Sequence, residues 1–272
     1  MPLRNRQPVN SLRVVPVSWF PDRQLDPQTV DLWHIELDVP SDVTNGMWNI
    51  LDSGERERAA RFRSSRQRAR FIVRRAMLRL LLSAYTGWRA DDLPISCKCP
   101  CGSQCHGKPK LPPEVGISFS TSSSSDTAVV GVSRTGEIGV DVELNAIEDR
   151  IVEELAISML STEERAKWDT LTRAERKRFG IDSWVRKEAV LKLWGCGLAI
   201  EPMAIPLTEL RPGVWRASGI AAFPDCHVIN LEPPLPGCAV AVAVPLFRKT
   251  MGARWLELTP RDVEEVFRAA NL

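Results

Sequence analysis

The stretch Ile138–Glu143, IGVDVE, is the part of the chain from which the fold and the chemistry are best interpreted. Its three apolar side chains alternate with Gly139, Asp141 and Glu143, and a period of two predicts a β-strand. Both carboxylates then project from one face, where they repel each other unless a cation is shared. Because Mg2+ prefers oxygen ligands, the pair favours a magnesium site. The structural alternative is a solvated strand face.

A second stretch, Trp184–Lys192, has the sequence WVRKEAVLK and the spacing of an amphipathic helix. Glu188 and Lys192 are four positions apart and therefore lie on the same helix face. A third carboxylate and lysines beside an acidic pair indicate phosphate chemistry, because cations neutralise a transferring phosphate. A lysine-rich surface helix is the structural alternative.

These two stretches together, GVDVE followed by WxxKEAxxK, resemble the paired signature of the 4'-phosphopantetheinyl transferases. The similarity is to the larger, surfactin-synthetase-type subclass, whose members are monomers built from two similar halves. It implies transfer of the phosphopantetheine arm of coenzyme A to a serine of an apo carrier protein, with release of adenosine 3',5'-bisphosphate. The carrier would be an acyl, peptidyl or aryl carrier domain of polyketide, nonribosomal peptide, fatty-acid or lysine biosynthesis.

The resemblance also implies roles for individual residues. Asp141, Glu143 and Glu188 match the metal ligands of the family, whose cofactor is Mg2+. Lys187 and Lys192 match its motif lysines and would offset phosphate charge. Glu188, directly or through a water, is the expected general base, and Lys192 is expected to act with it in catalysis.

An arginine-rich segment precedes these motifs, and the pattern from Gly54 to Ala84 predicts a long helix or a helix pair. A solvated helix face, phosphate binding and nucleic-acid binding are the alternatives for its arginines. In the family this segment serves the coenzyme A pocket. Arg70 occupies the position of a phosphate-binding arginine, and Arg58 and Arg61 are further candidates for the 3'-phosphate.

Cysteines are concentrated just after this segment, at Cys97, Cys99, Cys101, Cys105 and the adjacent His106. Thiolate and imidazole are preferred zinc ligands, so structural Zn2+ at the last four of these residues is one hypothesis. The spacing lacks paired CxxC knuckles and favours free thiols. The following Gly107-Lys108-Pro109 resembles a Gly-Lys-Pro element that lines coenzyme A in the family, which implicates Lys108 and Pro109.

The segment from Ile117 to Ser122 alternates like a strand, and Ala128 to Val132 predicts its hairpin partner. The family pattern here is Asn-x-Ser-His-Ser, whose serine and histidine bind coenzyme A phosphates. Ser120 and Ser122 match its two serines, whereas Thr121 replaces the histidine and lacks its charge, and Ser118 replaces the asparagine.

The composition is that of an ordinary globular protein, with 44% hydrophobic residues and a formal net charge of +2. A near-neutral charge gives no general attraction to nucleic acid or membrane. The longest apolar run is too short to span a bilayer, and seven cysteines without a secretory signal favour reduced thiols. We therefore expect a cytoplasmic protein.

Two similar α+β halves related by a pseudo-twofold are expected, each a small, mostly antiparallel sheet packed with a long helix. The predicted parts are an extended leader (1–29), a coenzyme A-binding subdomain (30–134), a subdomain with the magnesium motifs (135–250) and a peripheral tail (251–272). Coenzyme A is expected in the crevice between the subdomains.

Two functions of other classes remain as alternatives. One is a nucleic-acid-binding protein that uses the arginine helix and a zinc loop. The other is a magnesium-dependent nuclease that uses the three acids. The near-neutral total charge disfavours the first, and the Gly-Lys-Pro and Ser-x-Ser elements have no place in the second.

Overall fold

The computed structural model describes residues 29–97, 107–134, 136–231, 237–246 and 252–270. The chain forms two compact units. In the described residues, the first unit holds 34–94 and 257–270, and the second holds 29–33 and 95–256. The division passes through two strands that belong to one sheet.

The first unit is mainly helical. Its helices are α1 (Ser41–Met47), η1 (Trp48–Ile50), α2 (Ser53–Ala60), α3 (Ser65–Thr86) and α7 (Pro260–Ala270). Asp52 and Glu55 form a capping box that starts α2, and the Ser64 side chain caps α3. Helix α3 ends at Gly87, whose φ of 75° suits glycine. The predicted helix pair is therefore present, and its two members are separated where new caps occur.

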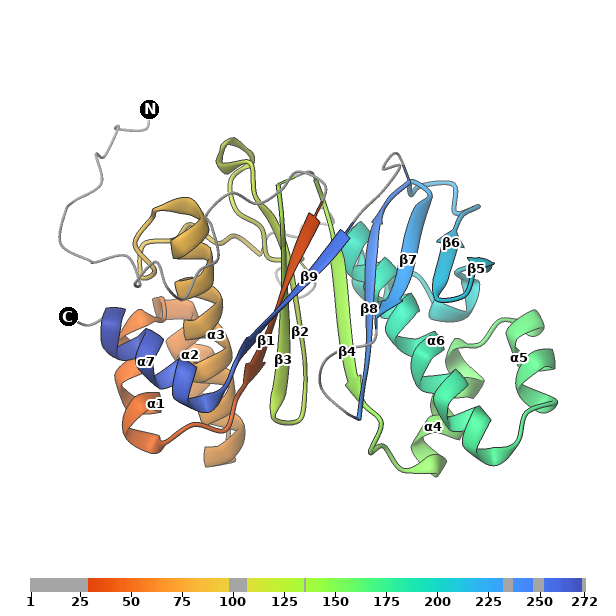
Figure 1. Cartoon of the computed structure of the whole chain (residues 1–272), viewed down its shortest axis with the longest axis horizontal. Helices are drawn as coiled ribbons and strands as arrows, with labels where there is room; N and C mark the ends of the chain where they lie inside the picture. The colour runs from red at the N-terminus through yellow and green to blue at the C-terminus, as the bar shows by residue number, and fades with distance from the viewer. Residues whose placement is uncertain (1–28, 98–106, 135, 232–236, 247–251, 271–272) are drawn as a thin grey trace. The chain divides into compact units, whose positions relative to one another are not determined.

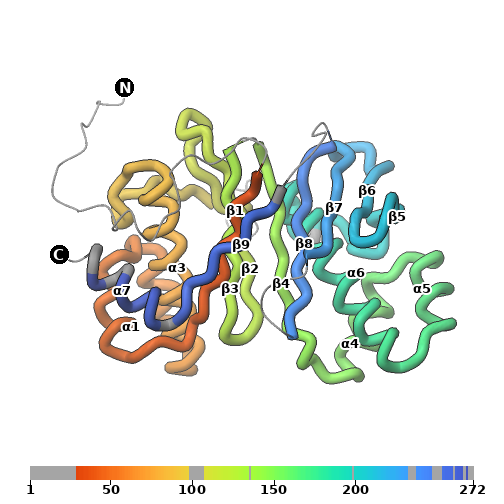
Figure 2. The backbone as a smooth tube through the Cα atoms, viewed as in Figure 1, coloured from red at the N-terminus to blue at the C-terminus, as the bar shows by residue number. Residues whose placement is uncertain are grey.

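A four-stranded sheet has the order β2-β3-β1-β9. Its strands are β1 (Thr29–Glu36), β2 (Ser118–Ser124), β3 (Thr127–Ser133) and β9 (Gly252–Leu258). Strands β2 and β3 form the predicted antiparallel hairpin. Figure 2 traces the C-terminal segment, in blue, to its place beside β1, where Arg254 binds both carboxylate oxygens of Asp31 at 2.8 Å. The segment expected to be a peripheral tail thus supplies a strand.

The second unit contains a five-stranded sheet of order β4-β8-β7-β6-β5 (Figure 1). Its strands are β4 (Gly139–Leu144), β5 (Leu207–Arg211), β6 (Val214–Ala217), β7 (Cys226–Leu231) and β8 (Cys238–Pro245). Alternation along β8 separates two cores: its alanines pack with helix α6 (Arg173–Trp194), and its valines pack with the β1, β3 and β4 side chains. The small alanine face lets the helix lie close to the sheet.

Helices α4 (Asp149–Met159) and α5 (Thr162–Asp169) follow β4 and contact α6. A capping box of Ser161 and Glu164 starts α5. Gly180 of α6 faces Val152 and Trp168 so closely that an added Cβ would lie 2.7 and 2.8 Å from their side chains. The remaining short helices are η2 (Pro113–Val115), η3 (Gly197–Ala199) and η4 (Pro202–Ala204). No helix in the described part of the chain has the length and apolar character needed to cross a membrane.

The predicted α+β class with two sheets is confirmed, and each half of the chain has one helix of 22 residues. The compact units do not follow the boundaries 30–134 and 135–250, because β2 and β3 belong to the same unit as β4 and α6. Helix α7 contacts α1 and therefore belongs to the first unit. The expected leader lies outside the described residues, except for Thr29.

Candidate functional site

Strand β4 presents Asp141 and Glu143 toward helix α6. Their antiparallel partners are Ala241 and Ala239 of β8, and directly opposed residues share a sheet face. Because both alanines belong to the core beneath α6, the carboxylates lie on that same side. The prediction that one strand face carries both acids agrees with this register.

Gly139 sets how closely α6 approaches β4. A Cβ at this position would lie 1.8 Å from the carbonyl oxygen of Ala189 and 2.5 Å from the amide nitrogen of Leu193. Glu188 immediately precedes Ala189 in the helix, and Lys192 immediately precedes Leu193. The absent side chain at Gly139 therefore allows the helix to bring its acid and its lysine to the strand.

Asp141 is 3% exposed and is the best-connected carboxylate of the site. Its Oδ1 accepts hydrogen bonds from Lys192 Nζ at 2.5 Å and from Ser122 Oγ at 2.7 Å. Lys192 also donates to Ser122 Oγ at 2.8 Å, which closes a triangle of three side chains. The second oxygen of Asp141, Oδ2, is buried and has no hydrogen-bond partner among the described residues.

Glu143 and Glu188 are electrostatically coupled to Asp141. Burial raises the pKa of Glu143, and the negative charge of Asp141 raises it further, although a hydrogen bond from Ser124 opposes the change. Burial also raises the pKa of Glu188, with the Asp141 charge as the next cause and Lys192 opposing it. Three carboxylates lie close together with one lysine nearby, so ionisation of all three is disfavoured by their mutual repulsion.

Such a donor set fits an oxygen-ligated cation. Oδ2 of Asp141 has no hydrogen-bond donor among the described residues, and the pKa values of Glu143 and Glu188 are raised. Carboxylates in this state are stabilised when a bound cation neutralises their charge. As the side chains stand, no group of three His, Cys, Asp or Glu residues within the described ranges has a ready metal-binding arrangement. A cation would therefore bind with adjustment of these side chains.

Lys187 lies elsewhere, although it precedes Glu188 in the chain. Its side chain is 0% exposed, and Nζ donates to Glu164 Oε2 and to the Met159 carbonyl oxygen, both at 2.5 Å. Burial lowers the pKa of Lys187, and Glu164 opposes that change. The structure thus uses Lys187 to join α6 to α5 and the end of α4, and does not bring it to the acids of β4.

Lys108 ties the Gly-Lys-Pro loop to the start of β4. Its Nζ donates to the Ile138 carbonyl oxygen at 2.7 Å and forms an ion pair with Glu137. Its side chain also lies beside Gly195, the residue that ends α6. Lys108 and the adjacent Pro109 are therefore in the same unit as the acidic motifs, next to both of them.

Ser120 and Thr121 occupy opposite faces of β2. The Ser120 hydroxyl accepts the backbone N–H of Val140 at 3.0 Å. The hydroxyl oxygen of Thr121 is buried, and no residue in the described ranges provides it with a hydrogen bond. Ser120 thus helps to hold β4, whereas the Thr121 hydroxyl makes no hydrogen bond within the described residues.

Arg70 and Arg58 belong to the first unit. Arg70 forms a two-pronged ion pair with Asp38, at 2.6 and 2.8 Å, and Arg66 binds the same carboxylate at 2.7 Å. These two arginines hold the pKa of Asp38 far below its usual range. The Arg58 guanidinium lies over the Phe71 ring, 5.5 Å from its centroid. Both arginines thus belong to a different unit from the acidic motifs.

The zinc hypothesis concerned Cys99, Cys101, Cys105 and His106, which lie outside the described residues. Cys97 is described and is exposed. The hypothesis remains a prediction.

Ser124, which the sequence did not single out, completes the site, because it donates to Glu143 Oε2 at 2.7 Å. The serines at 120, 122 and 124 repeat every two residues, as the acids of β4 do. This shared period is the sequence feature from which the role of Ser124 could have been predicted.

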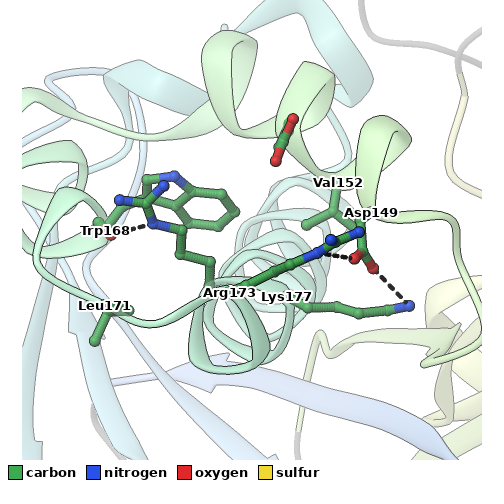
Figure 3. A pocket seen from close by; sticks show the side chains of 8 residues that line it. Asp149, Val152, Trp168, Leu171, Arg173 and Lys177 are labelled. Carbon is green, nitrogen blue, oxygen red and sulfur yellow. Dashed lines mark hydrogen bonds and ion pairs between the residues drawn. The ribbon is translucent and has the colours of Figure 1, made fainter.

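A separate cavity of about 500 Å³ lies among α4, α5 and the first turns of α6 (Figure 3). Asp149 pairs there with Arg173 at 2.7 Å and with Lys177 at 3.1 Å. Apolar walls come from Val152, Leu171 and the ring of Trp168. The cavity follows β4 and precedes the second motif in sequence, and it does not include the carboxylate site.

Comparisons with known proteins agree with this geometry. Residues 137–237 match the model of the 4'-phosphopantetheinyl transferase superfamily. The chain is 31% identical over 229 residues to the 4'-phosphopantetheinyl transferase HetI of Nostoc sp., covering 82% of this chain and 91% of HetI. It is 29% identical over 170 residues to a putative 4'-phosphopantetheinyl transferase of Synechocystis sp., covering 62% of this chain and 65% of that protein.

Among solved structures, the holo-acyl-carrier-protein synthase of Thermotoga maritima matches with a TM-score of 0.32 and 23% identity. That match covers 40% of this chain and 62% of the synthase. The extent of the HetI similarity shows the class: this chain is an enzyme of the phosphopantetheinyl-transferring kind. It belongs to the 4'-phosphopantetheinyl transferase superfamily. Nothing in these comparisons supports the nucleic-acid-binding alternative.

Proposed function

We propose that the protein transfers the 4'-phosphopantetheine arm of coenzyme A to a serine hydroxyl of an apo carrier protein, with release of adenosine 3',5'-bisphosphate. The observation that carries the proposal is the meeting of Asp141, Glu143, Glu188 and Lys192 between β4 and α6. These residues come from the two stretches that match the family signature. A buried acidic cluster with one lysine suits a reaction at a pyrophosphate.

Asp141, Glu143 and Glu188 would hold Mg2+ in this proposal. A cation held by these residues would supply positive charge that stabilises the pyrophosphate and the leaving bisphosphate. The orphaned Oδ2 of Asp141 is the oxygen most directly available to the cation.

Glu188 is the proposed general base. Its raised pKa makes its carboxylate a better proton acceptor than an exposed glutamate, and it is on the helix, away from the strand carboxylates in sequence. It would accept the proton of the carrier serine, directly or through a water, as that oxygen attacks the β-phosphate. Lys192, held by Asp141 and Ser122, keeps an ammonium group beside the reacting phosphates.

Coenzyme A contacts are proposed for Arg58, Arg70, Lys108, Pro109, Ser120 and Thr121. The structure adds a condition for Arg70, whose guanidinium is already bound to Asp38. A phosphate would have to compete with that carboxylate for the guanidinium. Lys187 contributes in this account by bracing α6, since its ammonium is buried and paired.

The carrier protein is proposed to dock near α4 and α5, the segment between the two motifs. Ile151 and Ile157 of α4 are exposed apolar side chains, 38% and 65% exposed, and the cavity in Figure 3 adjoins this helix. We further propose that the protein acts as a cytoplasmic monomer.

The proposal is tested by mass spectrometry of apo carrier proteins incubated with the protein, coenzyme A and Mg2+. Acyl, peptidyl and aryl carrier domains should be included, and at least one should gain one phosphopantetheine. Asp141→Ala should lower the rate by orders of magnitude while circular dichroism stays native, because the cation site loses an anchoring charge. Asp225→Ala is the matched control, since it removes an aspartate that pairs with Arg216 of β6, a strand that does not neighbour β4 in the sheet.

Failure of every carrier class to gain mass with folded protein would refute the proposal. If the same protein instead cleaved nucleic acid in a magnesium-dependent and Asp141-dependent manner, the nuclease alternative would replace it.

A further inference from the structure

Alternate serines of β2 form a ladder that faces β4. Ser120 accepts the N–H of Val140 at 3.0 Å, and Ser124 accepts the N–H of Leu144 at 3.3 Å. Between them, Ser122 reaches Asp141 at 2.7 Å. The hydroxyls therefore satisfy backbone groups on the edge of β4 that does not pair with β8, and they also reach its carboxylates.

Ser122 fixes the orientation of Asp141. A serine hydroxyl has one proton to donate, and Ser122 gives it to Asp141 Oδ1 while its oxygen accepts from Lys192. Oδ1 thus has two donors and is filled. Oδ2 is the oxygen that remains, buried and without a hydrogen-bond donor in the part of the chain that the structure describes. The pair of donors on one oxygen determines which oxygen is left for another ligand.

Ser124 orients Glu143 in the same way as Ser122 orients Asp141. It donates to Oε2 of Glu143 at 2.7 Å while accepting the next backbone N–H of β4. Ser124 therefore holds the glutamate from the strand side, in a position where the charge of Asp141 helps to raise its pKa.

We propose that Ser122 and Ser124 are positioning residues of the cation site, and that their hydroxyls orient Asp141 and Glu143 for the metal. This inference rests on the proposed function. It assigns Ser122 to Asp141 and Lys192, because the one proton that its hydroxyl could donate to a phosphate is already donated to Asp141. Partners that orient metal ligands typically contribute 10- to 100-fold to metal affinity.

The test measures binding of Mn2+ alone, with no coenzyme A, from the loss of the free-ion signal in electron paramagnetic resonance. Mg2+ should compete for the site. Ser122→Ala and Ser124→Ala should each weaken Mn2+ binding by about 10-fold. Ser124→Thr, which keeps the hydroxyl, should restore most of the affinity lost in Ser124→Ala.

Two control variants separate positioning from stability. Ser120→Ala removes an acceptor for a β4 N–H, as Ser124→Ala does, so both should lower the melting temperature, but only Ser124→Ala should lose Mn2+ affinity. Ser123→Ala lies on the opposite face of β2 and should leave Mn2+ affinity unchanged.

The outcomes distinguish this inference from the proposed function. Unchanged Mn2+ affinity in both serine variants, together with lost affinity in Asp141→Ala, would overturn the inference and leave the metal site standing. Absence of any Mg2+-competed Mn2+ binding in the unmodified protein would remove the metal site from the proposed function. If Ser122→Ala does not fold, Ser122→Cys preserves the volume with a weaker donor and should still weaken binding; native affinity in that variant would refute the role.

Discussion

Replacing Gly139 by alanine tests the packing on which the whole site depends. The added Cβ would lie 1.8 Å from the Ala189 carbonyl oxygen, 2.5 Å from the Leu193 amide nitrogen and 2.9 Å from the Ala189 carbonyl carbon. All three are backbone atoms of α6, so no side-chain rotation relieves the overlap. Because the clash is with backbone, Ala189→Gly should fail to rescue the variant.

The size of the effect follows from these distances. Carbon and oxygen atoms in contact are normally more than 3 Å apart, so α6 and β4 must separate by roughly 1.5 Å. Overpacking usually costs about 1 to 3 kcal/mol, and a clash with rigid backbone belongs at the upper end, about 3 kcal/mol. That destabilisation corresponds to a fall in melting temperature of roughly 6 to 12 °C. The same displacement would break the 2.5 Å contact between Lys192 and Asp141, and such misplacement lowers rates by about 100-fold.

Thermal unfolding and the transfer rate of Gly139→Ala should be measured together, below the melting temperature of the variant. Gly54→Ala provides the control, because its added Cβ meets nothing closer than 3.5 Å and alanine favours the helix. A Gly139→Ala protein with a melting temperature and rate close to those of the unmodified protein would refute the argument that this glycine sets the distance between helix and strand.

Three further predictions concern other parts of the chain. If Arg70 binds the 3'-phosphate, Arg70→Ala should raise the KM for coenzyme A much more than the KM for its 3'-dephosphorylated analogue. Asp38→Asn should lower the KM for coenzyme A, because the carboxylate that competes for the guanidinium is removed. Equal changes in KM for both substrates would exclude this role of Arg70. Burial and the neighbouring Arg216 lower the pKa of His227, so NMR titration should give this pKa below 6.5, and Arg216→Ala should raise the pKa. Because the folded protein favours neutral His227, the free energy of unfolding should decrease as pH falls below 6.5 through the folded-state pKa. Thr121→Val should stabilise the free protein slightly or leave it unchanged, because it removes a buried hydroxyl without a partner, and a raised Kd for coenzyme A in the same variant would show that this hydroxyl serves the ligand.

Local periodicity predicted the elements that carry the acidic site. Alternation in β4 placed Asp141 and Glu143 on one face, and the spacing of four placed Glu188 and Lys192 together on α6. Both rules depend only on backbone geometry within one element. The same rule argues against grouping Lys187 with Glu188: adjacent helix residues point about 100° apart, and the structure directs Lys187 to Glu164 instead.

Partners on other elements were not accessible in this way. The pairing of Arg70 with Asp38 joins residues 32 positions apart, and the contact of Ser124 with Glu143 joins strands that belong to different sheets. No period within either strand fixes the alignment of one sheet against another. The β9 strand was missed because it depends on pairing with β1, far away in sequence, rather than on a strong pattern of its own.

The short β4 sequence combines several requirements because each of its two faces has a separate task. Val140 and Val142 fill the core shared with β1, β3 and β8, while Gly139, Asp141 and Glu143 face α6. On the helix side, the glycine must come where the backbone of α6 is closest, and the acids must follow at steps of two to stay on that face. A shift of one residue would send both carboxylates into the valine core and a valine side chain into the helix backbone. The order of glycine, aspartate and glutamate is therefore a geometric condition for placing a charged site under a closely packed helix.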